Sequence, residues 1–400
     1  MLSPADAVAA IARHVTPLEP ESVPLTHLIG QVLREPIVAS RDQPPFDRVT
    51  MDGIAFASAA GRRSFRIAGT QAAGAPGQAL ADGEACFEVM TGAVAPTGCD
   101  CVVPVERISI DDGVATLADD VVATPGMNVH SRGLDCRAGE PLLQPGTRLG
   151  PPEVAVIASS GLSRALVSRS PRIVVISTGD ELIEPGEPVQ DWQIYRSNAY
   201  GVLASLQRRG YGHVAQDHLP DDLDTLRQRL RLHLDTHDVL ILSGGVSMGK
   251  FDFVPQVLTE LGIGVVFHKI AQRPGKPMWF GVGTTPSTQG RTVYALPGNP
   301  VSTLVCLSRY VLPGLAAAMG ASQNAAERIA LAEAVNVKPP LAFFLPVQCV
   351  PETAAQRLAR PRPTKGSGDF TSLIGTDGFV ELPPGPTLVP PGTVVPFYRW

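Results

Sequence analysis

The chain contains the stretch Ile241-Leu242-Ser243-Gly244-Gly245-Val246-Ser247-Met248-Gly249, in which an apolar run is followed at once by a glycine-rich loop. Two similar loops follow at nearly even intervals, Arg273-Pro274-Gly275-Lys276-Pro277 and Leu296-Pro297-Gly298-Asn299-Pro300-Val301-Ser302. Glycine lets backbone N–H groups approach a phosphate closely, and a helix start adds a positive dipole. Because open α/β sheets bind anionic ligands at the carboxyl ends of their parallel strands, these loops predict an anion site.

Strand and helix patterns alternate on both sides of this stretch. The predicted strands are 172–177, 214–218, 238–242, 263–270, 278–281 and 292–296. The predicted helices are 197–209, 223–234, 253–261 and 300–318. Alternation of this kind predicts a doubly wound, mostly parallel sheet domain. Short β-like runs with many glycines or prolines predict a β domain over 46–139 and a second one over 321–400.

Composition and charge narrow the class of protein. The chain has 400 residues, of which 44% are hydrophobic and 18% charged, and its net charge is −5. This length predicts several domains, and the acidic balance argues against nucleic-acid binding. The six cysteines form no C-x-x-C pair, and we find no signal peptide and no apolar run of the roughly 20 residues that span a bilayer. We therefore expect a cytoplasmic protein that binds no membrane.

Lysine is scarce in this chain, so its positions are informative. Only five lysines occur, and three of them, Lys250, Lys269 and Lys276, fall around the first two loops. Chance sampling is one explanation, and retention of ammonium groups for an anionic ligand is the other. Lys276 stands between Gly275 and Pro277, on a rigid turn, and this favours a ligand contact.

Carboxylates follow three of the predicted strands. Asp180 and Glu181 come after 172–177, Asp221 and Asp222 after 214–218, and Asp252 lies just past the first loop. Converging carboxylates beside a phosphate-binding loop predict a divalent metal such as Mg²⁺, held by oxygen ligands. The alternative for each acid alone is a helix N-cap, because Asp is a good cap.

Seven short motifs occur in order along nearly the whole chain. They are Pro45-Phe46-Asp47 with Met51-Asp52-Gly53, Met90-Thr91-Gly92-Ala93, Arg132-Gly133-x-Asp135, Ser177-Thr178-Gly179-Asp180-Glu181-Leu182, Ser243-Gly244-Gly245-Val246-Ser247, Pro274-Gly275-Lys276-Pro277 and Leu296-Pro297-Gly298-Asn299-Pro300. Taken together, these motifs identify a collinear resemblance to the molybdopterin molybdenumtransferase family (MoeA and the E domain of gephyrin).

The resemblance implies four domains and an elongated homodimer. Residues 1–19 with 171–320 would form the molybdopterin-binding α/β domain, and 20–45 with 140–170 a small mixed linking domain, beside the two β domains. The implied reaction takes adenylylated molybdopterin and molybdate, releases AMP with Mg²⁺ and leaves molybdenum on the dithiolene. Transient contacts with molybdopterin adenylyltransferase and with molybdoenzymes are also implied.

The resemblance also implies roles for individual residues. The catalytic positions would be Asp52, Asp135, Glu181, Asp252 and Lys276. The positions that bind molybdopterin or molybdate would be Thr91, Ser243, Gly244, Gly245, Ser247, Arg273, Pro297, Pro300 and Ser367. The metal ligands would come from Glu181, Asp221 and Asp252.

This chain departs from the family pattern at several of these motifs. The usual Asn-Ser-Ala is Arg48-Val49-Thr50, the following Tyr is Ile54, and the usual first Lys of Lys-Pro-Gly-Lys is Arg273. Leu345 stands where the family has an arginine that helps to bind molybdate. Either Arg360 or Arg362 takes its place, or the oxyanion is bound differently.

Two other functions stay open from the sequence. The Gly244-Gly245 loop also suits adenylyl transfer to molybdopterin, although single-domain adenylyltransferases would not need the flanking β domains. A non-catalytic molybdopterin-binding or scaffold role is favoured only by the missing arginine. ATP turnover with molybdopterin would support the first alternative, and peptide binding without molybdopterin binding would support the second.

Overall fold

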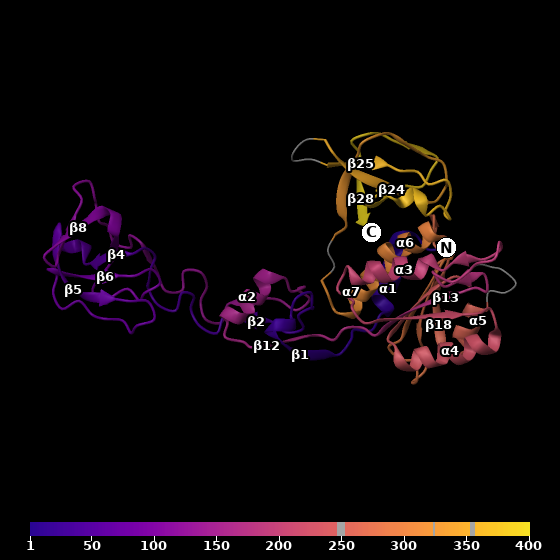
Figure 1. Cartoon of the computed structure of the whole chain (residues 1–400), viewed down its shortest axis with the longest axis horizontal. Helices are drawn as coiled ribbons and strands as arrows, with labels where there is room; N and C mark the ends of the chain where they lie inside the picture. The colour runs from indigo at the N-terminus through magenta and orange to yellow at the C-terminus, as the bar shows by residue number, and fades with distance from the viewer. Residues whose placement is uncertain (246–252, 323–324, 353–356) are drawn as a thin grey trace. The chain divides into compact units, whose positions relative to one another are not determined.

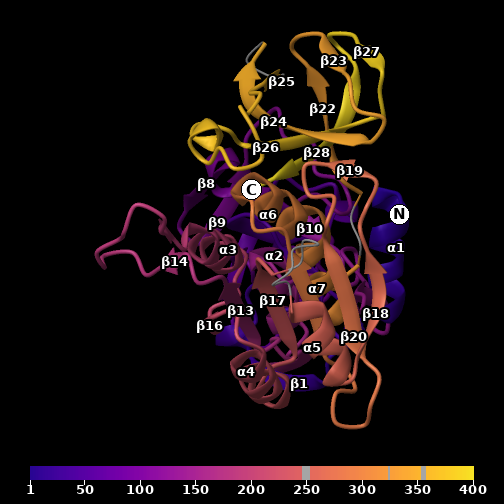
Figure 2. The ribbon, with the colours of Figure 1, turned by 90° about the vertical axis from the view of Figure 1, so that its right-hand side faces the viewer.

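The apolar run that ends at Ser243 is strand β17 (Val239–Ser243), which lies inside a six-stranded sheet in the computed structural model of the chain (Figures 1 and 2). The strand order is β16-β13-β17-β21-β20-β18. Four strands run parallel, and β20 is antiparallel to both of its neighbours. The predicted mostly parallel sheet is thereby confirmed. The other strands are β16 (Val214–Leu219), β13 (Ile173–Thr178), β21 (Thr292–Leu296), β20 (Trp279–Gly283) and β18 (Ile263–His268).

The structure describes residues 1–245, 253–322, 325–352 and 357–400. They divide into two units. The first comprises 1–34, 145–150 and 165–400, and the second comprises 35–144 and 151–164.

Helices cover both faces of the sheet, whose central strands β13, β17 and β21 are buried throughout (Figure 1). Ile173 and Val175 pack against α1, α3 and the helical run from α6 to α7, whereas Val174 and Ile176 pack against α4 and α5. Successive side chains of a strand point to opposite faces, so a strand covered on both sides must be apolar throughout. The helices are α1 (Pro4–His14), α3 (Ser197–Gln207), α4 (Leu223–Thr236), α5 (Val254–Glu260), α6 (Pro300–Cys306) and α7 (Leu312–Ala318).

The helical run Pro300–Ala318 is 19 residues long and apolar. By length and composition alone it could cross a membrane, but 72% of its most apolar window is buried inside the protein. Its central π-helical stretch, η4 (Leu307–Val311), places Tyr310 in the core beneath the sheet. The apolar character of this run is that of a core helix.

A β domain follows the sheet domain within the first unit. Its six-stranded sheet has the order β19-β24-β25-β22-β28-β26. Strand β19 (Gln272–Arg273) comes from the second glycine loop of the sheet domain and pairs in parallel with β24 (Ala342–Pro351). The other strands of this sheet are β22 (Glu327–Leu331), β25 (Arg357–Pro361), β26 (Gly378–Leu382) and β28 (Val394–Arg399). Strands β23 (Val335–Val337) and β27 (Thr387–Val389) pair with each other in a separate two-stranded sheet. The pairing of β19 with β24 fixes the second loop against this domain.

The second unit holds the other β domain and a short helix. The domain is a six-stranded sheet of order β7-β4-β6-β5-β9-β8. These strands are β4 (Gly53–Phe56), β5 (Ser64–Gln71), β6 (Ala85–Val89), β7 (Cys101–Pro104), β8 (Ile108–Asp111) and β9 (Val114–Leu117). Two short pairs complete the unit together with α2 (Pro151–Ser159): β3 (Arg48–Val49) with β10 (Val129–His130), and β2 (Ile37–Val38) with β11 (Pro141–Leu143).

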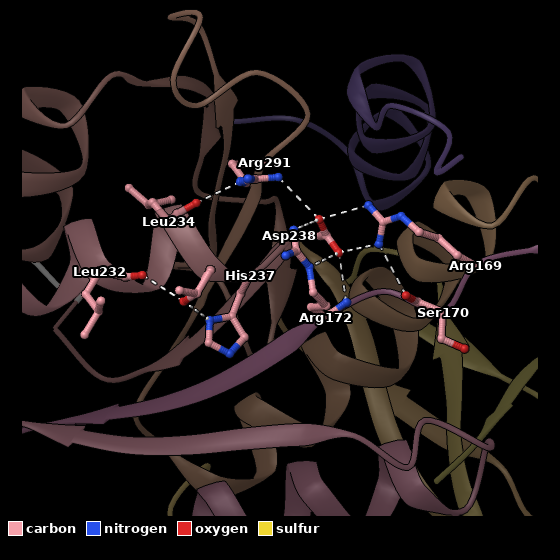
Figure 3. Close-up of polar contacts among 9 residues, drawn as sticks. Arg169, Ser170, Arg172, Leu232, Leu234, His237, Asp238 and Arg291 are labelled. Atoms are coloured by element: carbon pink, nitrogen blue, oxygen red, sulfur yellow. Dashed lines mark hydrogen bonds and ion pairs between the residues drawn. The ribbon is translucent and has the colours of Figure 1, made fainter. Parts of the chain in front are cut away.

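A buried carboxylate ties together the amino edge of the main sheet (Figure 3). Asp238, just before β17, is 2% exposed and accepts hydrogen bonds from Arg169 at 2.7 Å and from the backbone N–H of Arg172 at 2.9 Å. The guanidinium groups of Arg172 and Arg291 also reach it, at 2.9 and 3.3 Å. Burial alone would raise the pKa of Asp238, but the hydrogen bonds from Arg169 and Arg172 outweigh it and hold this pKa well below its usual range.

We expect Asp238→Asn to lower the free energy of unfolding by about 3 kcal/mol, because it leaves three arginines without their buried counter-charge. The native pKa is lowered, so the charged form stabilises the fold above about pH 4 and this contribution disappears as the pH falls below that value. Urea unfolding at pH 7 and pH 3, followed by circular dichroism, measures both effects.

The matched control is Asp235→Asn, which changes an exposed acid on the neighbouring helix α4. Equal unfolding midpoints for Asp238→Asn and the wild type at pH 7 would contradict the assigned role.

Candidate functional site

The first and third glycine loops meet at the carboxyl edge of the sheet. In register, Ser177 of β13 lies beside Ser243 of β17, which lies beside Leu296 of β21. The backbone N–H of Gly244 donates to the carbonyl of Leu296 at 3.2 Å. Gly244 has φ +102°, and a Cβ there would lie 2.7 Å from the carbonyl oxygen of Thr178. Only glycine therefore allows the first loop to lie this close to the end of β13.

Asn198, at the start of α3, holds these two loops together. Its Nδ2 donates to Oγ of Ser243 at 2.9 Å and to the carbonyl of Gly298 at 2.7 Å. Its Oδ1, Oγ of Ser177 and Oγ1 of Thr178 are buried without a hydrogen-bond partner among the described residues. Buried polar atoms are rarely left unpaired, so the base of this edge keeps capacity to bind polar groups.

The predicted carboxylates lie at the ends of the adjacent strands β13 and β16. Glu181 folds back over Gly179, where a Cβ would meet its Oε2 at 2.5 Å. The backbone N–H of Asp221 donates to Oδ1 of Asp180 at 3.2 Å, which brings the two strand ends together. Asp222 instead caps α4, accepting from the N–H of Thr225 at 2.8 Å. The predicted residues Asp252 and Ser247 lie outside the described residues, and the described ones contain no group of three metal-ligating side chains.

A cationic pocket of about 510 Å³ lies beside the third loop, between the sheet domain and the C-terminal β domain of the first unit. Four cationic residues line it, Arg273, Lys276, Lys338 and Lys365, together with the predicted Pro297 and Ser367. No carboxylate residue is among the lining residues that the structure describes. Within the described part of the chain none of the four cationic side chains has an ion-pair partner. This arrangement suits a small anion.

The pocket contains Leu345 but neither of the arginines considered as its substitutes. Arg362 donates to Oε1 of Gln348 at 2.7 Å, and Arg360 lies 3.7 Å from Glu333. Lys338 and Lys365 are the cations that the C-terminal domain contributes to the lining. Neither lysine belongs to the cluster singled out in the sequence, where they are far from the three loops.

Three motifs of the second unit gather around the short pair of β3 and β10. Val49 exchanges backbone hydrogen bonds with Gly92 and Ala93, at 2.8 and 2.9 Å. Beside them, Asp52 accepts from the backbone N–H of Thr91 at 2.6 Å and from its hydroxyl at 2.7 Å. These two hydrogen bonds, the backbone one first, lower the pKa of Asp52.

Asp135 lies on the third motif of this unit. Its Oδ1 is 3.0 Å from Nε2 of His130, the last residue of β10. Asp52, Thr91 and Asp135 are therefore held at exposed turns by the β3–β10 pair and its neighbours. Among the described residues, the carboxylate of Asp52 bonds Thr91 and that of Asp135 bonds His130, and each has lone pairs left to accept further hydrogen bonds.

Comparison with known proteins places the whole chain in one family. Residues 2–161 match the family described as MoeA N-terminal region (domain I and II), 174–317 match the probable molybdopterin binding domain, and 328–400 match the MoeA C-terminal region (domain IV). The molybdopterin molybdenumtransferase of Synechocystis sp. is 40% identical over 403 residues, covering 100% of both chains. The chain belongs to the MoeA family.

Other MoeA relatives agree with this membership. The molybdopterin molybdenumtransferase of Haemophilus influenzae is 33% identical over 77% of this chain and 75% of its own. A crystal structure of the molybdopterin biosynthesis MoeA protein from Pyrococcus horikoshii matches with a TM-score of 0.78 and 29% identity, over 100% of this chain and 99% of that one. The resemblance drawn from the seven motifs is confirmed, and so is the multidomain fold.

We expect Asn198→Ala to keep the fold and to weaken binding of an anionic ligand at the carboxyl edge about tenfold, because the two loops lose their common donor. Titration calorimetry with the adenylylated form of molybdopterin measures the affinity. The control is Asn128→Ala, which removes a hydrogen bond from a side-chain amide to the carbonyl of Val102 in the other unit. Unchanged affinity in Asn198→Ala would show that the loops need no bridge.

Proposed function

We propose that this MoeA protein inserts molybdenum into adenylylated molybdopterin and releases AMP. The observation that carries the proposal is the pocket lined by four cationic residues and, among the described residues, by no carboxylate, beside glycine loops at the carboxyl edge of the sheet. Both substrates are anions. Positive side chains and backbone N–H groups fixed in advance are what binds and stabilises such charge.

Each part of the site has a place in this reaction. Molybdate would bind among Arg273, Lys276 and Lys338, with the hydroxyl of Ser367 as a neutral donor. The phosphates of the adenylylated substrate would bind at the loops of Gly244, Gly245, Pro297 and Pro300, where glycine admits close contact. The dithiolene would thus meet molybdate while the phosphates stay fixed.

The reaction balances as two substitutions without oxidation. A water oxygen attacks the phosphorus of the adenylyl group, the bond to the bridging oxygen breaks, and AMP leaves while molybdopterin keeps its own phosphate. Molybdate exchanges one oxide, which departs as water with the two thiol protons, for the two dithiolene sulfurs. Carboxylates at the strand ends are suited to orient the attacking water.

The donor set at the strand ends fits Mg²⁺ by its chemistry. Glu181 and Asp221 offer carboxylate oxygens, the ligands that Mg²⁺ takes, and we assign Asp252 as a further one. Bound Mg²⁺ supplies positive charge against the phosphate oxygens. Glu181 and Asp221 also keep the two strand ends acidic, opposite in charge to the oxyanion pocket.

We further propose that the enzyme works as a cytoplasmic homodimer. Asp52, Thr91 and Asp135 of the second unit would contribute to a site shared between subunits. All six cysteines are free thiols, as a reducing compartment requires. Adenylylated molybdopterin would come from a molybdopterin adenylyltransferase and the product would go to molybdoenzymes, through transient contacts.

We expect the purified protein with Mg²⁺ to release AMP from adenylylated molybdopterin when molybdate is added, and to stop when the metal is chelated. Lys276→Ala should reduce this release about a hundredfold, because a positive charge in contact with the oxyanion is lost. Chromatographic quantification of AMP measures it. Arg360→Ala, an exposed cation on β25, is the matched control. Tight binding of the substrate without any AMP release by the wild type would contradict the proposal and favour a carrier.

We expect Lys338→Ala to raise the molybdate concentration needed for half-maximal AMP release about tenfold, since Lys338 supplies charge on the side where Leu345 supplies none. Adding Leu345→Arg to this variant should restore much of the loss. Arg362→Ala, whose side chain binds Gln348, should leave the molybdate dependence unchanged. The assignment is wrong if Arg362→Ala and Lys338→Ala have the same effect.

A further inference from the structure

A fully buried amide lies under the loop that carries Lys276. Gln272, on β19, is 0% exposed, and all its hydrogen-bonding groups are engaged. Its Oε1 accepts from the hydroxyl of Tyr310, and its Nε2 donates to the carbonyl of Pro274 at 2.9 Å and toward Sγ of Cys306 at 3.7 Å. Burying an amide costs free energy unless its partners are supplied, so this position is held by a specific network.

The loop rests directly on this network. Gly275 has φ +90°, and a Cβ there would lie 2.6 Å from Nε2 of Gln272 and 2.7 Å from Sγ of Cys306. The thiol of Cys306 donates to the carbonyl of Gly275 at 3.7 Å, and the N–H of Ile270 donates to the carbonyl of Lys276 at 2.9 Å. Three consecutive carbonyls, those of residues 274 to 276, are therefore each held from below.

The carbonyl of Pro274 decides which way the amide faces. A carbonyl oxygen can only accept, so the NH₂ group of Gln272 points toward it, and the Oε1 that remains accepts from the hydroxyl of Tyr310. Tyr310 itself is 0% exposed, and burial raises its pKa far above the usual range, so its proton stays in place. Each hydrogen bond in the series from Tyr310 through Gln272 to Pro274 therefore has a fixed donor and a fixed acceptor.

The same two residues of β19 connect the loop to the opposite wall of the pocket. Gln272 pairs with Ala342, and Arg273 pairs with Phe343, on strand β24 of the C-terminal domain. Strand β24 also carries Leu345 into the pocket lining. A shift at Gln272 would therefore move the cations of the loop relative to the wall they face.

We propose that Gln272, hydrogen-bonded to Tyr310, is a positioning residue of the oxyanion pocket: it holds the Pro274 carbonyl and thereby directs the side chains of Arg273 and Lys276 toward the anion. The inference rests on the proposed function for the identity of that anion, molybdate. Gln272 itself touches the loop from beneath and is not among the groups assigned to contact substrate.

The test compares three variants at the network. Gln272→Leu and Tyr310→Phe should raise the Kd for molybdate about tenfold or more in titration calorimetry, with a far smaller effect on kcat at saturating molybdate. In Gln272→Glu the introduced carboxyl can donate to Pro274 only while protonated, and burial raises its pKa. Its molybdate affinity should therefore be near that of the wild type at low pH and fall as the pH rises, in a way the wild type does not.

Gln256→Leu is the matched control, because it removes an exposed amide on α5 that bonds Glu260. If Gln272→Leu fails to fold, the inference is tested by the pH dependence of molybdate affinity in Gln272→Glu and by the molybdate Kd of Tyr310→Phe. A pH profile of Gln272→Glu parallel to that of the wild type would overturn the inference. Absence of AMP release by a wild type that binds molybdate would instead defeat only the proposed function. A wild type that binds no molybdate would overturn both.

Discussion

The parallel pairing of β13, β17 and β21 is the constraint on which the rest of the structure depends. Parallel neighbours end at the same edge of a sheet, so the strand ends at Thr178, Ser243 and Leu296 lie side by side. The loops that follow these strands therefore lie close to one another. Glycine at 244 lets the backbones approach, and Asn198 then joins two of the loops through one amide. At the other edge, the buried carboxylate of Asp238 forms ion pairs with three arginines. The amino edge of the sheet thus holds the buried ion-pair cluster, and the carboxyl edge holds the loops of the proposed site.

Positive and negative side chains are also separated in the sheet domain and its neighbouring β domain. The chain is acidic overall, yet three of its five lysines line a single pocket. Cations gathered in a concave site concentrate their field there, which attracts an anion and holds it against water. Carboxylates lie instead at the ends of β13 and β16. Under the proposed function, this separation of signs would keep the oxyanion and Mg²⁺ from competing for the same groups.

Much of this arrangement could be predicted from local patterns. Apolar runs ending in glycine loops predicted the strands and the sheet edge at which the first and third loops meet, because both features are encoded by neighbouring residues. The lysine cluster was less informative. Lys276 does line the pocket, but Lys250 lies outside the described residues and Lys269 is not among the lining residues. Lys338 and Lys365 come from the C-terminal domain, and only the folded structure shows that they line the same pocket.

The supporting residues could not be predicted because nothing in the local sequence marks them. Asn198 and Gln272 are single amides whose partners come from distant segments, and an amide in a helix start or a short strand has many ordinary explanations. Asp238 likewise reads as the start of a strand until its three arginines are placed around it. Residues of this kind hold the backbone in place through distant partners. Glycine and lysine motifs, by contrast, are local patterns from which a candidate site can be predicted.

The central claim is that the pocket between the sheet domain and the C-terminal domain binds the oxyanion. The most direct measurement is a crystal structure of the protein with molybdate, in which anomalous scattering locates molybdenum. We expect a molybdenum peak within hydrogen-bonding reach of Lys276, Lys338 and Ser367. A peak confined to another site, or an empty pocket at saturating molybdate, would contradict this account.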